Sequence, residues 1–121
     1  MATIDEFKHI EMMLGTIVKA EYIEGADKLL RLEVDFGMKQ TTQEDGTMKE
    51  EADIRQILSG IREYYEPEQL IGKQCPFVTN LEPRTLRGLV SNGMILAVGS
   101  ADGGAVLLHP DKETPPGSKL R

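Results

Sequence analysis

Hydrophobic and charged positions alternate from residue 30 to residue 36, where single charged residues separate Leu30, Leu32, Val34 and Phe36. A period of two turns one side chain toward a core and the next toward solvent, so this segment predicts a half-buried β-strand. Five other runs also predict strands, at residues 14–23, 54–60, 74–79, 94–98 and 105–109. The chain is therefore predicted to be all-β.

Two short helices accompany these strands. Thr3 and Glu6 have the spacing of a capping box, which predicts the start of a helix near the N-terminus. Residues 67–72 begin with a proline and end with a glycine, as short helices often do. Residues 38–53 are polar and acidic around Asp45 and Gly46, and they predict an extended hairpin tip or a mobile loop.

The order of these elements indicates a particular architecture. A small helix between the third and fourth strands is the usual arrangement of the OB-fold, a five-stranded Greek-key barrel, and the last strand adds a C-terminal β extension. The chain has neither a tandem repeat nor a long linker. Residues 1–121 are therefore predicted to form one domain, with residues 38–53 as an excursion from it.

The stretch from residue 80 to residue 97 is predicted to join the fourth strand to the fifth. It begins with a polar turn at Asn80, continues as a loop with Arg84 and Arg87, and enters the next strand through Ser91 and Asn92. A cationic loop held between two buried strands is suited to an anionic ligand. The alternative is that its proline and its glycines only mark turns.

Net charge changes this picture only in part. The chain has 14 basic and 20 acidic residues, a net charge of −6, whereas nucleic-acid-binding surfaces are usually basic. Most of the excess negative charge precedes residue 54, and between residues 54 and 97 five basic residues accompany four acidic ones. A local cationic surface around Lys28, Arg55, Arg62, Lys73, Arg84 and Arg87 is therefore compatible with an acidic protein.

Catalytic and metal-binding motifs are missing from the sequence. His9 and His109 lack neighbours at ligand spacing, and Glu50 and Glu51 lie in a solvated segment, so neither an enzyme nor a cofactor is predicted. The single cysteine, Cys75, stands in an apolar run and predicts a buried, inert thiol. The N-terminus lacks a signal peptide and no apolar run approaches 18 residues, so a cytoplasmic protein is expected.

Five motifs in sequence order carry a resemblance to the tRNA-binding domain family, which includes the C-terminal domain of bacterial methionyl-tRNA synthetases and their free-standing homologues. The resemblance extends from about residue 4 to residue 120, with only residues 38–53 outside the pattern. The motifs are Ala26–Leu29, Arg55–Arg62, Asn80–Gly88, Ser91–Met94 and Pro110–Gly117.

The resemblance implies a homodimer of OB-folds that grips the outer corner of an L-shaped tRNA by its shape. It also implies roles for single residues. Lys28 and Arg87 would neutralise phosphates, and Asn80 and Ser91 would offer hydrogen bonds. Arg84 stands where the family often has a small residue and Asn92 where it has a glutamine, so their own charge and polarity, and not the resemblance, add them to the predicted contacts. Ser59 matches an earlier family motif, and Met94 is expected to pack beneath the site. Asn80 is alternatively an Asx-turn residue that ends its strand.

Several positions depart from the family pattern. Glu82 and Thr85 replace two lysines that the family often has, Asn92 replaces a glutamine, and Met13 replaces an arginine of the first strand. Each missing phosphate contact lowers the affinity for RNA. It also weakens the salt dependence of binding, because roughly one counterion fewer is released. A weak or altered binder is therefore an alternative to typical binding by the family.

The predicted function is non-catalytic tRNA binding, as a free-standing protein or as a domain associated with an aminoacyl-tRNA synthetase, such as a methionyl-tRNA synthetase β subunit. One alternative is an export-related peptide-binding chaperone of the same dimeric fold. Chaperones of this kind usually have an Asn-Phe-Pro-Pro turn where this chain has Asn80-Leu-Glu-Pro83, so the sequence favours tRNA. The other alternative is an assembly domain that only docks an enzyme.

Overall fold

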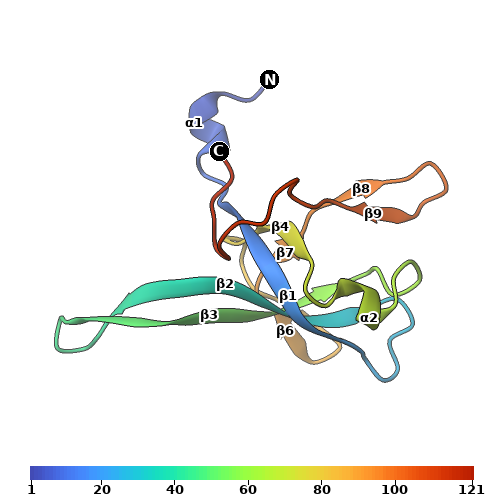
Figure 1. Cartoon of the computed structure of the whole chain (residues 1–121), viewed down its shortest axis with the longest axis horizontal. Helices are drawn as coiled ribbons and strands as arrows, with labels where there is room; N and C mark the ends of the chain where they lie inside the picture. Colours follow the sequence, from blue (N-terminus) through green and yellow to red (C-terminus); the bar gives the residue numbers. More distant parts are fainter.

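The computed structural model describes all residues from 1 to 121, and most of its regular structure is β-strand (Figure 1). Its elements, in chain order, are α1 (Ile4–Phe7), β1 (Met12–Tyr22), β2 (Leu30–Thr42), β3 (Met48–Ser59), α2 (Pro67–Leu70), β4 (Gln74–Val78), β5 (Arg84–Leu86), β6 (Leu89–Ser91), β7 (Met94–Ile95), β8 (Ala97–Gly99) and β9 (Ala105–Leu107).

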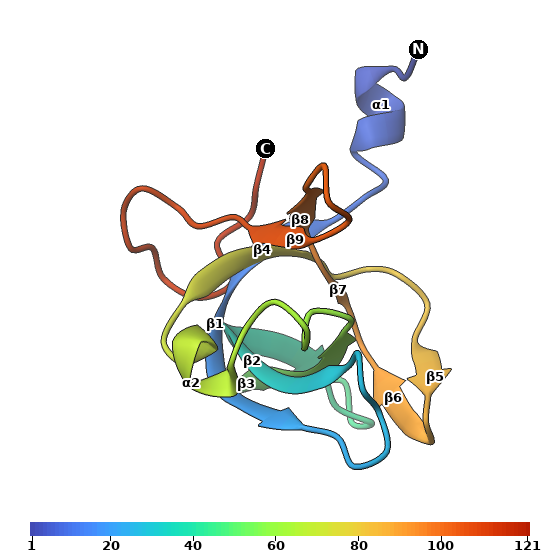
Figure 2. The same ribbon diagram turned by 90° about the vertical axis from the view of Figure 1, so that its right-hand side faces the viewer.

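Five antiparallel strands form one sheet in the order β3-β2-β1-β4-β7. The sheet curls into a partly closed barrel, with α2 between β3 and β4 at one opening (Figure 2). Two further hairpins, β5–β6 and β8–β9, are separate from this sheet. The all-β prediction and the predicted OB-fold with short helices and a C-terminal β extension are confirmed.

The barrel core is built by the alternating side chains that the sequence pattern singled out. Leu30, Leu32, Val34 and Phe36 are all buried and face Ile17, Ile57 and Phe77, which are completely buried. The rings of Phe36 and Phe77 meet edge to face, with their centroids 5.4 Å apart. Gly15 lies against this core, where an added Cβ would come within 2.4 Å of Val34. The core requires a glycine here because the strands approach too closely for a larger residue.

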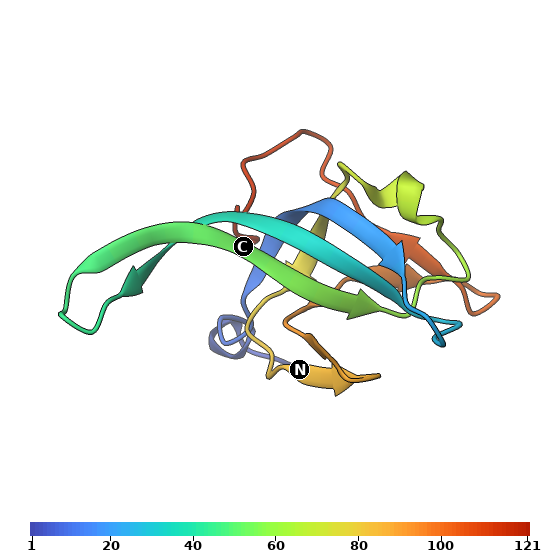
Figure 3. The same cartoon turned by 90° about the horizontal axis from the view of Figure 1, so that it is seen from below.

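Residues 38–53 form an extended β-hairpin, one of the two forms predicted for them. Strand β2 continues to Thr42, and β3 begins at Met48, so that only residues 43–47 form the tip. A register shift between Asp35 and Met38, where Gly37 has a φ of 80°, bends this arm away from the barrel. The arm projects well beyond the remaining strands (Figure 3).

The C-terminal segment lies against the start of β1. Leu14 donates a backbone hydrogen bond of 2.8 Å to Ser118, and Met13 forms an isolated bridge with Lys119. The capping box at Thr3 is present, as predicted, and begins α1. Neither helix has the length and apolar character that crossing a bilayer requires.

The predicted strand at residues 94–98 is divided into two. Strand β7 pairs with β4 as far as Ile95, and Leu96 then donates its N–H to the carbonyl of Pro76. Beyond this point the chain leaves the barrel, and β8 pairs with β9 instead. The run of apolar residues could not reveal this break because both halves are apolar.

Candidate nucleic-acid interface

The segment predicted to be a loop with two arginines is a β-hairpin. Strands β5 and β6 pair Arg84 with Ser91, and the turn between them consists of Arg87 and Gly88. Both turn residues have a positive φ, 53° for Arg87 and 78° for Gly88, as a two-residue type I′ turn requires. Each strand has only three residues, too few for an alternating pattern to stand out in the sequence. The turn presents Arg87 at the tip of the hairpin.

Arg84 and Arg87 are both exposed, and neither forms an ion pair. Lys28 is also exposed and unpaired, in the turn between β1 and β2. This turn and the β5–β6 hairpin lie on the same side of the barrel (Figures 1 and 2). The three side chains therefore offer positive charge to an anionic ligand that approaches from this side.

Of the other three predicted cationic residues, Lys73 is exposed between α2 and β4, and the two arginines are bonded within the protein. Arg55 donates to both carboxylate oxygens of Asp53 and to the backbone carbonyl of Thr79. Arg62 lies over the ring of Tyr22 and donates to the carbonyl of Ala26, at 2.7 Å. Their guanidinium groups are therefore committed to the fold.

Asn80 is occupied in the same way. Its side-chain oxygen accepts a hydrogen bond from the N–H of Glu11, and its side-chain nitrogen donates to the carbonyl of His9, both at 2.8 Å. These partners lie in the connection between α1 and β1, so the Asx-turn interpretation is wrong. The amide joins the start of the β4–β7 connection to the N-terminal segment.

Ser59 and Ser91 are both buried, with exposed fractions of 8% and 2%. The Ser91 hydroxyl accepts a hydrogen bond of 3.0 Å from the N–H of Leu58 and donates to the carbonyl of Gly93. Ser59 pairs with Leu30 at the end of β3. These positions make the two serines parts of the barrel wall.

Asn92 and Met94 are exposed. Met94 has 40% of its surface in solvent, so the expectation that it packs beneath the site is wrong. The strand pairs Met94 with Val78 and turns Ile95 inward instead. Asn92 lines a polar cleft of about 420 Å³ between the free edge of β3 and the segment that follows β4, together with Arg55, Thr79 and Pro83.

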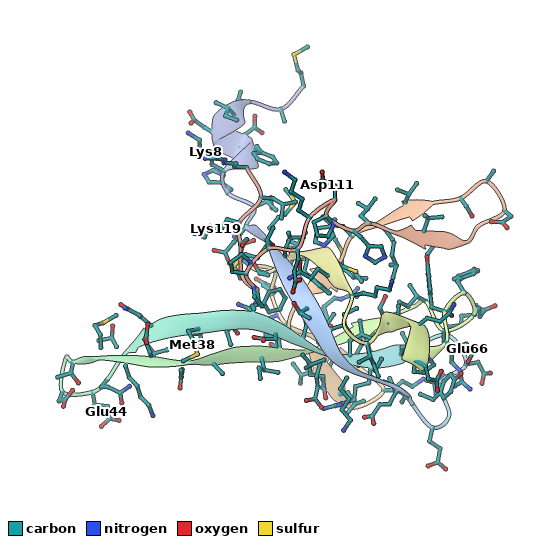
Figure 4. All side chains as sticks on the ribbon, in the orientation of Figure 1. Lys8, Met38, Glu44, Glu66, Asp111 and Lys119 are labelled. Atoms are coloured by element: carbon teal, nitrogen blue, oxygen red, sulfur yellow. The ribbon has the colours of Figure 1, made fainter.

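Some of the acidic groups lie away from the β5–β6 hairpin, although Asp27 neighbours Lys28 and Glu82 precedes Arg84 in the chain. Figure 4 shows Glu44 at the far tip of the β2–β3 arm and Glu66 beside α2. Glu66 accepts a hydrogen bond from the Tyr22 hydroxyl, which raises the pKa of Tyr22. Arg31 donates to Glu33 and lowers the pKa of that carboxyl. The net charge of −6 therefore does not exclude an anionic ligand at the β5–β6 hairpin.

Gln56 is a residue of this site that the sequence did not single out. Its side-chain nitrogen donates a hydrogen bond of 2.8 Å to the carbonyl of Val90 in β6, and its backbone carbonyl accepts from Asn92. Gln56 lies within β3, and nothing in the neighbouring sequence indicates that its side chain makes this contact. Only the position of β3 at the sheet edge indicates that its polar groups can bind another segment.

Comparisons with known proteins agree with this fold. A family model described as "Putative tRNA binding domain" matches residues 12–119. The chain is 46% identical to the methionine–tRNA ligase of Methanococcoides burtonii over 118 residues, which are 98% of this chain and 15% of that protein. The corresponding ligase of Bacillus subtilis is 39% identical over 119 residues, 98% of this chain and 16% of that enzyme. The chain thus spans about one sixth of the length of these relatives or less.

Two solved structures resemble the whole chain. The crystal structure of a MetRS related protein from Pyrococcus horikoshii has a TM-score of 0.83 and 33% identity, and the match covers 100% of this chain and 98% of that one. The chaperone CsaA from Bacillus anthracis has a TM-score of 0.80 and 32% identity, with coverage of 100% and 99%. The same fold is therefore found in proteins with two different descriptions.

Proposed function

Because this chain belongs to the tRNA-binding domain family, we propose that it binds tRNA without catalysing a reaction. The observation that carries the proposal is the β5–β6 hairpin, which presents Arg84 and Arg87 to solvent with no acidic partner. Phosphate groups are the ligands that unpaired guanidinium groups bind best. Lys28 on the neighbouring turn adds a third cation to this surface.

Binding would proceed by electrostatic capture and polar docking. Lys28, Arg84 and Arg87 neutralise phosphates, and the exposed amide of Asn92 donates or accepts a hydrogen bond beside the cleft. Asn80, Ser59 and Ser91 support the site from within, because their polar groups are buried or already bonded. Phe36 and Phe77 are core residues and cannot stack on bases. Recognition of the folded shape of tRNA is therefore favoured over reading of its sequence.

We further propose that the protein is a homodimer. Figures 1 and 2 show α1 and the β8–β9 hairpin on the same side of the barrel, and both elements carry exposed apolar side chains. Phe7 is 42% exposed, and the paired residues Val98 and Val106 are 50% and 48% exposed. Burying these side chains against a second copy would remove an apolar patch from water. An aminoacyl-tRNA synthetase is the protein partner that the ligase relatives suggest, and tRNA would be met in the cytoplasm.

Similarity to the chaperone CsaA supports a second candidate function, the binding of unfolded peptides. A groove of about 270 Å³ between α1 and the C-terminus is lined by Ile4, Phe7, Ile10 and Leu120, and it could take apolar peptide side chains. The exposed arginines favour tRNA, because an apolar peptide gives them no partner. An assembly domain that binds neither ligand is the third possibility.

One experiment separates the three functions. Fluorescence anisotropy would measure the binding of total tRNA at low salt and, in parallel, of an unfolded apolar peptide, while light scattering measures the mass in solution. We expect tRNA binding that weakens as salt increases, no comparable peptide binding, and the mass of a dimer. Peptide binding without tRNA binding would support the chaperone, and binding of neither ligand would support an assembly domain.

A further inference from the structure

The β5–β6 hairpin has few means of holding its position. It is not a member of the five-stranded sheet, and of its strand residues only Ser91 is buried, while Leu86 and Leu89 are half-buried. A two-stranded hairpin of this size is only marginally stable alone. Contacts with the rest of the protein must therefore determine where Arg84 and Arg87 point.

Arg55 contacts the residues on either side of residues 80–91, the segment that contains the β5–β6 hairpin. One nitrogen of its guanidinium group, Nη1, donates to the carbonyl of Thr79 at 2.7 Å and to the carbonyl of Asn92 at 3.4 Å. Thr79 directly precedes this segment, and Asn92 directly follows it. A single side chain on β3 thus joins the point where the chain leaves the barrel to the point where it returns.

Asp53 fixes the orientation of this guanidinium group. Its two carboxylate oxygens accept hydrogen bonds from Nε at 3.0 Å and from Nη2 at 3.1 Å, and only 7% of its side-chain surface is exposed. The ring of Phe36 lies under the guanidinium group, with its centroid 5.2 Å from Cζ. The two hydrogen bonds to Asp53 and the contact with the Phe36 ring fix the plane of the guanidinium group. In this orientation Nη1 points at the two carbonyls.

Gln56 holds the hairpin at a second point. Its side-chain nitrogen donates to Val90, and its side-chain oxygen accepts a hydrogen bond of 2.6 Å from Nε of Arg31. Arg31 is in turn bonded to Glu21 and Glu33. The hairpin is therefore attached to β3 by polar side chains at Arg55 and Gln56, in addition to the bond from the N–H of Leu58 to the Ser91 hydroxyl.

We propose that Arg55, oriented by Asp53, is a positioning residue for tRNA binding: it holds the hairpin in the place from which Arg84 and Arg87 reach the phosphates. The proposal rests on the proposed function. Lysine cannot replace this arginine, because a single ammonium group cannot bond both oxygens of Asp53 and two carbonyls in one plane. The substitution Arg55→Lys keeps the positive charge but cannot form this set of hydrogen bonds.

The main experiment measures tRNA affinity as a function of salt for the wild-type protein and for Arg55→Lys. We expect the dissociation constant to rise about tenfold at low salt, as displacement of well-placed charged groups would produce. The number of counterions released on binding, which the salt dependence of the affinity reports, should fall by roughly one to two, although the charge of the protein is unchanged. In an Arg84→Ala/Arg87→Ala background the same substitution should have no further effect, because it acts through those two arginines.

Gln74→Ala is the matched control. The Gln74 side chain also joins separate segments by hydrogen bonds, to Thr16 and to the backbone of Thr114, but neither partner lies in the hairpin segment or in the turn that carries Lys28. This variant should lose stability and retain the wild-type affinity and salt dependence. Equal losses of affinity in Arg55→Lys and Gln74→Ala, or an unchanged salt dependence in Arg55→Lys, would overturn the proposal.

Amide hydrogen exchange in the absence of RNA tests whether Arg55 holds the hairpin in place, independently of whether the protein binds tRNA. In Arg55→Lys, the amides of residues 84–91 should exchange faster while those of β1 and β4 remain protected. If the variant does not fold, Asp53→Asn, which keeps the size of the side chain, should show the same local change. Unchanged exchange in the hairpin would show that Arg55 does not hold the hairpin in place. If the wild-type protein bound no tRNA but exchange was faster in the variant, the proposed function would be wrong and the positioning of the hairpin by Arg55 would still hold.

Discussion

Asn80 accepts a hydrogen bond of 2.8 Å from the backbone N–H of Glu11, a residue 69 positions earlier in the chain. The other end of the same amide donates to His9. The amide therefore fastens the N-terminal segment to the start of the β4–β7 connection. A residue that family resemblance suggested as an RNA contact thus has a clear structural task.

Asn80→Ala is expected to destabilise the fold. The substitution removes two hydrogen bonds to backbone groups, each worth about 1 kcal/mol, so the free energy of unfolding should fall by about 1–2 kcal/mol. Urea unfolding followed by circular dichroism measures this change. Asn92→Ala is the control, since Asn92 is exposed and should change stability by no more than about 0.5 kcal/mol. Equal stability of the two variants would contradict the assignment.

Arg84→Ala/Arg87→Ala is expected to weaken tRNA binding. Two unpaired cations are removed, and the salt dependence should fall by roughly 0.7–0.9 for every phosphate that is no longer neutralised. Filter binding at several salt concentrations measures both quantities. Lys8→Ala/Lys112→Ala removes the same charge from exposed positions outside the hairpin and should retain the affinity. If the arginine variant bound as well as the wild type at low salt, the hairpin would not be the binding surface.

Ser91→Ala is expected to lower stability because it leaves the buried N–H of Leu58 without an acceptor. An unsatisfied buried donor costs about 1–3 kcal/mol. Thermal unfolding of the variant, beside Thr85→Ala on the exposed face of the same hairpin, measures the difference. A loss of tRNA affinity with unchanged stability would instead indicate that Ser91 contacts RNA directly.

Val98→Asp is expected to dissociate the proposed dimer. The substitution places a charge in the centre of the exposed apolar pair formed with Val106, and burying an unpaired carboxylate is costly. Sedimentation velocity should show a monomer for this variant and a dimer for Ile71→Asp, which places the same charge at an exposed position next to α2. A dimer in both variants would exclude this face as the interface.

The thiol of Cys75 should be unreactive in the folded protein. Burial raises its pKa to about 11, because the thiolate would lose hydration. In the unfolded chain the thiol ionises near pH 9, so this group lowers the free energy of unfolding as the pH rises from 9 to 11 and has no effect below that range. Alkylation by iodoacetamide at pH 8 should be slow in buffer and fast in urea. Rapid alkylation of the folded protein would show that Cys75 is accessible.

Much of the fold could be predicted from local patterns. The alternation around Leu32 and Val34, the capping box at Thr3 and the proline of α2 each depend on residues close in sequence. The β5–β6 hairpin was missed because its turn uses Arg87 in a left-handed conformation, without the asparagine that usually announces such a turn. The break at Leu96 was missed because strand pairing, and not composition, decides it.

The amino-acid sequence by itself determined the alternating core positions of β2, the two short helices and the family, because periodicity and motifs are local or linear features. Only the tertiary structure decided which polar residues remain free. Asn80, Arg55 and Ser91 meet partners 69, 24 and 33 positions away, and a hydrogen bond across such a separation leaves no local trace in the sequence. Whether Arg84 and Arg87 pair with a carboxylate is likewise decided by the tertiary structure, in which neither forms an ion pair.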